Sequence, residues 1–258
     1  MMKIAILYIC TGKYSIFWKD FYKSSEIYFL KDHRKDYFVF TDADILRFEN
    51  KNNVHKIYQE NLGWPGNTLF RFKMFEAITD TLKDFDYIFF FNANAKFITY
   101  INEEILPIND DIVVVQHPGF YNAGYEQLPY EKDQKSLAHC VPSKDSVYVQ
   151  GCLSGGKAKE YIQLINTLKN NTDIDYNNGI IAIWHDESHL NKYIQDVSYK
   201  LLNPGYCYPS NFNLPFTKKI IMRDKNNYMN VDYLRGLNSN RSLLSEFIYK
   251  IKSLLRLK

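Results

Sequence analysis

Short continuous apolar runs alternate along the chain with longer stretches whose apolar residues recur every three or four positions. The runs of strand length are residues 3–9, 37–41, 86–91 and 111–116. The stretches that predict helices are residues 15–30, 67–82 and 156–169, the second with Asn67 as its N-cap. Buried parallel strands read as continuous apolar runs, and helices form the crossovers between them. The pattern therefore predicts an α/β fold with a mainly parallel central sheet flanked by helices.

The second half of the chain continues this alternation. Residues 179–184 (GIIAIW) predict a buried strand, and residues 186–195 predict the helix that follows it. Gly155 and Gly156 lie together, which indicates either a tight turn or a close approach of two backbones. Because we find no internal repeat and no linker rich in proline, glycine or serine, we expect residues 1–240 to form one domain.

Polar clusters follow the ends of several predicted strands. These clusters are residues 11–14, 92–94, 117 and 185–187. In open α/β sheets, ligands bind beyond the carboxyl ends of the strands. We therefore expect the clusters to meet in one ligand site at that edge of the sheet.

Residues 241–258 have a different pattern from the rest of the chain. Apolar residues recur there at spacings of three and four, and the basic residues Arg241, Lys250, Lys252, Arg256 and Lys258 lie mainly between them. This pattern is typical of a cationic amphipathic helix. Two roles fit it: packing on the domain or on a second chain, and peripheral contact with an anionic membrane.

Charge and cysteine content exclude several classes of protein. The formal net charge is +3, and because the tail is basic, the rest of the chain is close to neutral and has no strong field for nucleic acid. The four cysteines form no C-x-x-C pair, so we expect free thiols in a reducing cytoplasm. We expect no signal peptide and no membrane span, because no apolar run approaches about 20 residues.

The densest polar cluster is His185-Asp186-Glu187-Ser188-His189. Histidines four positions apart share a helix face, and in the H-E-x-x-H motif such a pair binds zinc with the glutamate as general base. Here Asp186 stands at the glutamate position, and no third ligand is evident downstream. A zinc hydrolase that uses His185 and His189 is therefore a minor alternative.

Six motifs occur in the order in which a known family has them. They are GKY (12–14), YFVFTD (37–42), HPGFY (117–121), SGG (154–156), NNGI (177–180) and WHDESHLNKY (184–193). With them, the chain from about residue 8 to about residue 227 resembles glycosyltransferase family 6, which contains the histo-blood-group A and B transferases and the α1,3-galactosyltransferase. The resemblance covers the catalytic domain, so we expect a bacterial-type member without the stem and membrane anchor of the animal enzymes.

The resemblance implies a GT-A fold and a retaining transfer of galactose or N-acetylgalactosamine from a UDP-sugar, with an α1,3 linkage in the product. The positions that match donor-binding residues are Ile9, Cys10, Thr11, Tyr14, Arg71, Gln150, Gly151, Cys152 and Lys225. Those that match acceptor-binding residues are His117, Trp184 and Glu187. Asp186 matches a contact to the donor sugar, and Asp186 and Glu187 are our candidates for catalytic residues.

The sequence departs from the family at Asn92-Ala93-Asn94. The family has a D-x-D motif at these positions, and its carboxylates bind manganese at the diphosphate. Divalent cations prefer carboxylates to neutral amides, so we expect Asn92 and Asn94 to face the donor without a metal ion or other cofactor. Fixed cations would then stabilise the leaving UDP. The candidates are Lys225 and Arg71, and after them Arg223 and Arg235.

The sequence also bears on the donor sugar, the acceptor and the class of protein. Gly151 and Cys152 are small and leave room for a 2-acetamido group, which favours N-acetylgalactosamine over galactose. By analogy with the blood-group enzymes, we expect an oligosaccharide acceptor that is a fucosylated galactoside. The alternative is a carbohydrate-binding protein that lost activity with the D-x-D motif, against which the intact carboxylates Asp186 and Glu187 argue.

Overall fold

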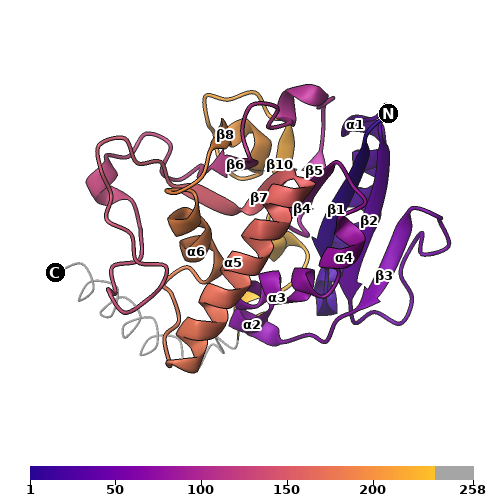
Figure 1. Cartoon of the computed structure of the whole chain (residues 1–258). Coiled ribbons are helices and arrows are strands. Elements are labelled where there is room, and N and C mark those ends of the chain that lie inside the picture. The colour runs from indigo at the N-terminus through magenta and orange to yellow at the C-terminus, as the bar shows by residue number, and fades with distance from the viewer. Residues whose placement is uncertain (236–258) are drawn as a thin grey trace.

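A seven-stranded sheet forms the centre of the protein in the computed structural model, which describes residues 1–235 (Figure 1). The strands in spatial order are β3 (Val54–Tyr58), β2 (Arg34–Thr41), β1 (Lys3–Ile9), β4 (Tyr87–Phe91), β7 (Val149–Lys157), β6 (Ile112–Gln116) and β8 (Tyr199–Leu202). The first four run parallel to one another, β7 runs antiparallel to β4 and β6, and β8 is parallel to β6. The sheet is therefore mainly parallel, as the apolar runs predict.

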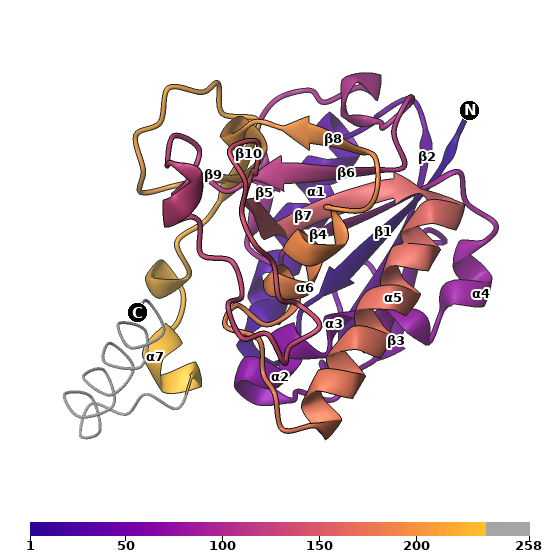
Figure 2. The ribbon, with the colours of Figure 1, turned by 60° about the vertical axis from the view of Figure 1, so that its left-hand side comes forward.

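Helices cover both faces of the sheet (Figure 2). The longer ones are α1 (Trp18–Tyr28), α5 (Ala158–Asn177) and α6 (Asp186–Tyr193). Tyr8 of β1 packs against Phe21 of α1, with 4.4 Å between ring centroids. Its neighbour Leu7 belongs to the other core, which contains Leu164 of α5. Successive residues of β1 thus enter two cores, as expected for a strand with helices on both sides.

A second, three-stranded sheet brings the C-terminal part of the described chain to the end of β4. Its order is β5 (Ala95–Phe97), β10 (Ile220–Met222) and β9 (Tyr208–Pro209). Directly after β10, the backbone N–H of Arg223 donates to the carbonyl of Asn94 at 3.0 Å. The short helix η5 (Lys225–Asn227) follows, so this sheet places Lys225 beside residues that are far from it in sequence.

The predicted single helix over residues 67–82 is wrong. The chain forms α2 (Gly63–Leu69), α3 (Arg71–Glu76) and α4 (Thr79–Leu82), with breaks at Phe70 and Ile78. Phe70 leaves helical geometry and packs edge-on against Tyr176 of α5, with 5.0 Å between centroids. Asn67 lies inside α2 and is no N-cap; its Nδ2 donates to Oδ1 of Asn61 at 2.7 Å.

Two predictions for the second half of the chain need correction. Residues 179–184 form no strand: they connect α5 to α6, and Ile181 and Trp184 are exposed. The apolar residues of this segment therefore do not form the predicted buried strand. Gly155 lies within β7, where a Cβ atom would come 2.4 Å from Cδ1 of Phe89. For Gly155, the prediction of a close approach is therefore confirmed, and the alternative prediction of a tight turn is wrong.

The predicted tail, residues 241–258, lies outside the described residues, and so do residues 236–240 at the end of the predicted catalytic domain. Within residues 1–235, no helix combines the length and the apolar character that a membrane crossing requires.

Candidate active site

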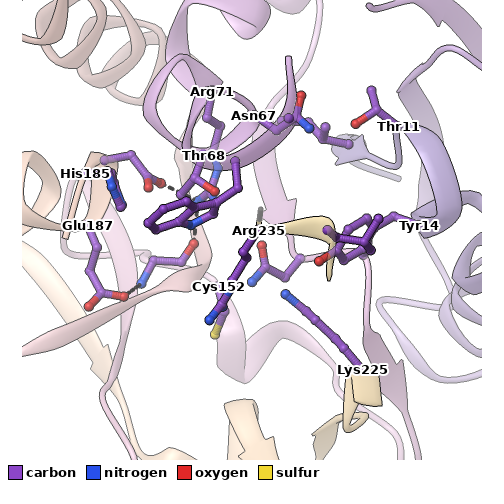
Figure 3. A pocket seen from close by; sticks show the side chains of 18 of the residues that line it. Thr11, Tyr14, Asn67, Thr68, Arg71, Cys152, His185, Glu187, Lys225 and Arg235 are labelled. Atoms are coloured by element: carbon purple, nitrogen blue, oxygen red, sulfur yellow. Dashed lines mark hydrogen bonds and ion pairs between the residues drawn. The ribbon is translucent and has the colours of Figure 1, made fainter. Parts of the chain in front are cut away.

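A pocket of about 410 Å³ opens at the carboxyl ends of β1 and β4 (Figure 3). The predicted site residues that line it are Ile9, Thr11, Tyr14, Arg71, Asn92, Gln150, Gly151, Cys152, Trp184, Asp186, Glu187 and Lys225. Figure 3 shows Glu187 and His185 on one side and Thr11 and Tyr14 on the other, with Lys225 pointing into the space between them. The expectation that the polar clusters meet at one edge of the sheet is confirmed for residues 11–14, 92 and 185–187.

The turn at His185 directs the two carboxylates into this pocket. His185 precedes α6 with φ 55° and ψ −125°, a conformation that L-residues rarely adopt. Its ring packs edge-on against Trp64, with 5.5 Å between centroids. Because α6 begins immediately after this turn, Asp186 and Glu187 occupy its first two positions at the pocket wall.

Asp186 is buried and forms an ion pair with Arg71. Its Oδ2 lies 2.7 Å from Nη1 of Arg71, and the guanidinium group stacks over the ring of Phe90, 4.2 Å from the centroid. The same Nη1 donates to the carbonyl of Gly151. Burial raises the pKa of Asp186 to about 6, although Arg71 opposes the shift by favouring the charged form.

Glu187 has one hydrogen-bond donor on each carboxylate oxygen. The Tyr148 hydroxyl donates to Oε1 at 2.9 Å, and the Gly151 backbone N–H donates to Oε2 at 2.8 Å. Burial raises the pKa of Glu187 to about 7, against these two hydrogen bonds, which favour the ionised form. A carboxylate held in this way at a pocket wall is suited to nucleophilic or electrostatic catalysis.

The pocket also contains the cations that an anionic ligand requires. Lys225 lies with Nζ 5.2 Å from the centroid of the Tyr14 ring, and Arg235 lines the same pocket. Burial, together with the neighbouring charges of Arg235 and Arg71, lowers the pKa of Lys225 to about 8. An ammonium group destabilised in this way gains from a bound anion.

Arg223 is not a ligand-binding residue, contrary to its place among the candidate cations. Its guanidinium group is buried and donates to the carbonyls of Asn94, Phe17 and Ala95, while Nη1 lies 3.2 Å from Oδ2 of Asp20. These bonds tie the second sheet to the N-terminal part of the chain. The role of Arg223 is therefore structural.

The residues at the D-x-D positions do not fit a divalent cation. Asn92 lines the pocket, but the side chain of Asn94 is buried away from the pocket lining, and its Nδ2 donates to the carbonyl of Arg223 at 2.8 Å. Its Oδ1 finds no hydrogen-bond partner among the described residues. The two side chains therefore carry no charge and do not point toward a common site for a cation.

The histidines of the zinc alternative also fail to form a metal site. Nε2 of the buried His189 lies 3.7 Å from Oδ2 of Asp175, which is itself bonded to the Ser136 hydroxyl and the Leu137 N–H. His185 faces the pocket instead. Across residues 1–235, no three His, Cys, Asp or Glu side chains gather as metal ligands.

Two other predicted site residues lie off the pocket lining. Cys10 is fully buried behind it, and burial raises the pKa of its thiol to about 12. His117 packs against Tyr148, with 5.8 Å between centroids, so it reaches Glu187 only through that tyrosine. Burial lowers the pKa of His117 to about 4, which keeps the ring neutral.

Sequence patterns missed one wall of the pocket. This wall comes from the segment before α3 and includes Asn61, Gly63, Trp64 and Thr68. The segment follows no apolar run, so its place beside the sheet edge leaves no periodic signal. Tyr148 was missed as well, because its link to Glu187 joins residues 39 positions apart.

Comparison with known proteins gives this pocket a family context. Residues 2–235 match the model of Glycosyltransferase family 6. The O-antigen biosynthesis glycosyltransferase WbnI of Escherichia coli is 38% identical over 224 residues, which cover 87% of this chain and 95% of that protein.

Animal proteins are similar at lower identity. Histo-blood group ABO system transferase 1 of Rattus norvegicus is 29% identical over 213 residues, covering 80% of this chain and 60% of the relative. Globoside alpha-1,3-N-acetylgalactosaminyltransferase 1 of Gallus gallus is 29% identical over 219 residues, covering 80% and 62%. The chain thus spans less than two thirds of these animal relatives.

Proposed function

This chain belongs to glycosyltransferase family 6, and on that basis we propose that it is a metal-independent, retaining hexosyltransferase with a GT-A fold. It moves N-acetylgalactosamine, or galactose, from the UDP-sugar to the 3-hydroxyl of a galactoside, forming an α1,3 linkage. The observation that carries the proposal is the joint presence in one pocket of Glu187, Asp186 and Lys225, with the neutral Asn92 in place of an acidic ligand.

The donor occupies the pocket from the β1 side to the α6 side. Thr11 and Tyr14 lie beside the uridine, and Lys225 and Arg235 neutralise the diphosphate. The sugar lies against Gly151, which has no side chain, and Cys152, whose side chain is small, so that space remains for a 2-acetamido group. Because UDP leaves with increasing negative charge, fixed cations stabilise the transition state more than the bound donor.

Glu187 acts at the anomeric carbon in this proposal. Retention of configuration requires a carboxylate nucleophile or a front-face route through an ion pair, and an ionised carboxylate supports either one. Asp186 forms an ion pair with Arg71, and in this proposal it hydrogen-bonds the donor sugar. The two neighbouring carboxylates thus have different roles, set by their different partners.

The acceptor binds on the outer side of the pocket. Trp184 lines the pocket and is 38% exposed, so its ring is available to stack on a sugar. The printed names of the relatives refer to an O-antigen, a blood-group antigen and globoside. We assign an oligosaccharide acceptor of this class with a terminal galactoside, fucosylated as in the blood-group substrates.

A panel of UDP-sugars against galactoside acceptors, with linkage analysis of the products, tests this proposal. We expect an α1,3-linked product, with UDP-N-acetylgalactosamine preferred over UDP-galactose. UDP release without glycosylated product would indicate the wrong acceptor, and tight UDP-sugar binding without UDP release would indicate the carbohydrate-binding alternative. Comparable kcat/KM for both donors would refute the assigned donor preference.

Residues 241–258 extend the proposal to location, on sequence grounds alone. Basic residues near an anionic surface contribute about 1 kcal/mol each, so the tail favours reversible contact with the cytoplasmic membrane face. Protein cut after Asn240 should keep its activity on soluble acceptors and no longer sediment with anionic vesicles. If the full-length chain ignores such vesicles at low salt, the tail packs on the domain or on a second chain.

A further inference from the structure

Tyr148 and Glu187 are joined by a hydrogen bond that the family motifs do not reveal. Tyr148 directly precedes β7 and is only 2% exposed, and its hydroxyl donates to Oε1 of Glu187 at 2.9 Å. Three residues further along, the Gly151 N–H donates to Oε2 at 2.8 Å. One short segment therefore fixes both oxygens of the carboxylate.

The Tyr148 ring is itself held in place by aromatic neighbours. Its centroid lies 5.6 Å from that of Phe120 and 5.4 Å from that of Tyr130, with the rings edge-on in both pairs. The Tyr130 hydroxyl donates to the carbonyl of Val147 at 2.9 Å, next to Tyr148 in the chain. The phenol oxygen consequently has little freedom to move away from Glu187.

A second set of bonds fixes the backbone of Glu187 relative to the same segment. The side chain of Asn191 on α6 accepts from the Val149 N–H and donates to the Val149 carbonyl, both at 2.9 Å. It also donates to the carbonyl of Glu187 at 2.9 Å. Both the backbone and the carboxylate of Glu187 are thereby held to the start of β7, an arrangement that preorganises a catalytic group.

We propose that Tyr148 is a positioning residue that holds the Glu187 carboxylate, through one hydrogen bond, toward the anomeric carbon of the donor. This inference rests on the proposed function, because it assumes that Glu187 acts at that carbon. The bond also favours the charged form of Glu187, which burial disfavours. Burial and the nearby Glu187 raise the pKa of Tyr148 itself, so the phenol remains a donor.

The other ionisable groups near Glu187 do not offer this bond. Asp186 adjoins it on α6 and disfavours its charge, while Arg71 on α3 favours it but bonds Asp186 and the Gly151 carbonyl. The buried thiol of Cys207 also interacts with the Glu187 charge. Removing the Tyr148 hydroxyl leaves all three in place, so its effect is separable from theirs.

Tyr148→Phe, with Tyr37→Phe as the matched control, provides the test. Tyr148→Phe removes a hydrogen bond to a charged group, so kcat should fall about tenfold. The acidic limb of kcat/KM should shift to higher pH by about one unit, because the ionised form of Glu187 loses a donor. The KM for UDP-sugar should stay unchanged. Tyr37→Phe also removes a buried hydroxyl, one that bonds Ser25 and Glu26 and lies off the pocket lining, so its kcat and pH profile should match those of the wild type.

Two further measurements keep the test decisive. If Tyr148→Phe fails to fold, 3-fluorotyrosine at position 148 preserves the ring and strengthens the donor, so the acidic limb should move to lower pH. If the wild type shows no transfer, the proposed function fails, and carbon-13 NMR titration of Glu187, assigned with Glu187→Gln, tests the bond alone. An unchanged kcat and acidic limb, or an unchanged Glu187 titration in Tyr148→Phe, overturns the inference.

Discussion

Arg71 and Asp186 form a buried ion pair, with 2.7 Å between Nη1 and Oδ2 and less than a tenth of either side chain exposed. The charge of Arg71 is therefore shared with a carboxylate before any donor binds. A second bond from Arg71 to the Gly151 carbonyl fixes the guanidinium group further. We infer that Arg71 orders the sugar end of the pocket, while Lys225 and Arg235 neutralise the diphosphate.

A double-mutant cycle tests the buried pair. Arg71→Met leaves Asp186 without its partner and should lower the free energy of unfolding at pH 8 by about 3 kcal/mol, since removing one half of a buried pair leaves an uncompensated charge buried. Arg71→Met with Asp186→Leu should recover most of that loss. Chemical denaturation of the four proteins measures the coupling, and strictly additive losses would show that the pair does not interact.

Lys225 should carry much of the stabilisation of the leaving UDP. Lys225→Ala should lower kcat/KM by about 100-fold, the order found when one preorganised electrostatic contact to a developing charge is removed. Lys218→Ala is the control, because Lys218 is exposed over the Tyr208 ring and lies off the pocket lining. Equal effects of the two changes on steady-state kinetics would assign the loss to overall charge.

The lowered pKa of Lys225, about 8, predicts a basic limb in kcat/KM for the donor. As pH rises through 8, the free enzyme loses the ammonium proton and with it the positive charge, so the rate should fall. Lys225→Arg keeps its charge at all accessible pH values, and its profile should stay flat above pH 8. A basic limb that persists in Lys225→Arg would belong to another group.

Much of the fold could be predicted because its strands are buried on both faces. Lys3–Ile9 forms β1 over the predicted range, and the start of α6 at Asp186 is also right. Thr11 and Asn92 meet because β1 and β4 run parallel and their ends share one edge of the sheet. For these residues, local pattern and tertiary position agree.

The rest depends on contacts between distant segments. Apolar periodicity over 67–82 does not show that Phe70 packs on α5 and interrupts the helix just before Arg71. Nothing near Arg223 or Lys225 in the sequence shows that the first is buried against three carbonyls while the second faces the pocket. Those differences arise only when β10 pairs with β5.

Gly151 should tolerate no side chain without a cost to catalysis. A Cβ atom there would lie 3.3 Å from Cβ of Glu187, so Glu187 must give way by a few tenths of an ångström, and 3.6 Å from its Oε2, which is ordinary contact. Gly151→Ala should lower kcat, but by less than the factor of about 100 that a displacement of about 1 Å costs. Gly124→Ala, at a glycine with open space around it, should leave kcat unchanged. A normal kcat in Gly151→Ala would show that Glu187 needs no such placement.

The transfer rate from UDP-N-acetylgalactosamine in excess EDTA tests the central claim most directly, with Glu187→Gln as the inactive reference. With neutral Asn92 and Asn94 at the D-x-D positions and Lys225 and Arg235 in the pocket, the account predicts the same rate in EDTA as in added manganese. Loss of transfer in EDTA, restored by manganese, would contradict it.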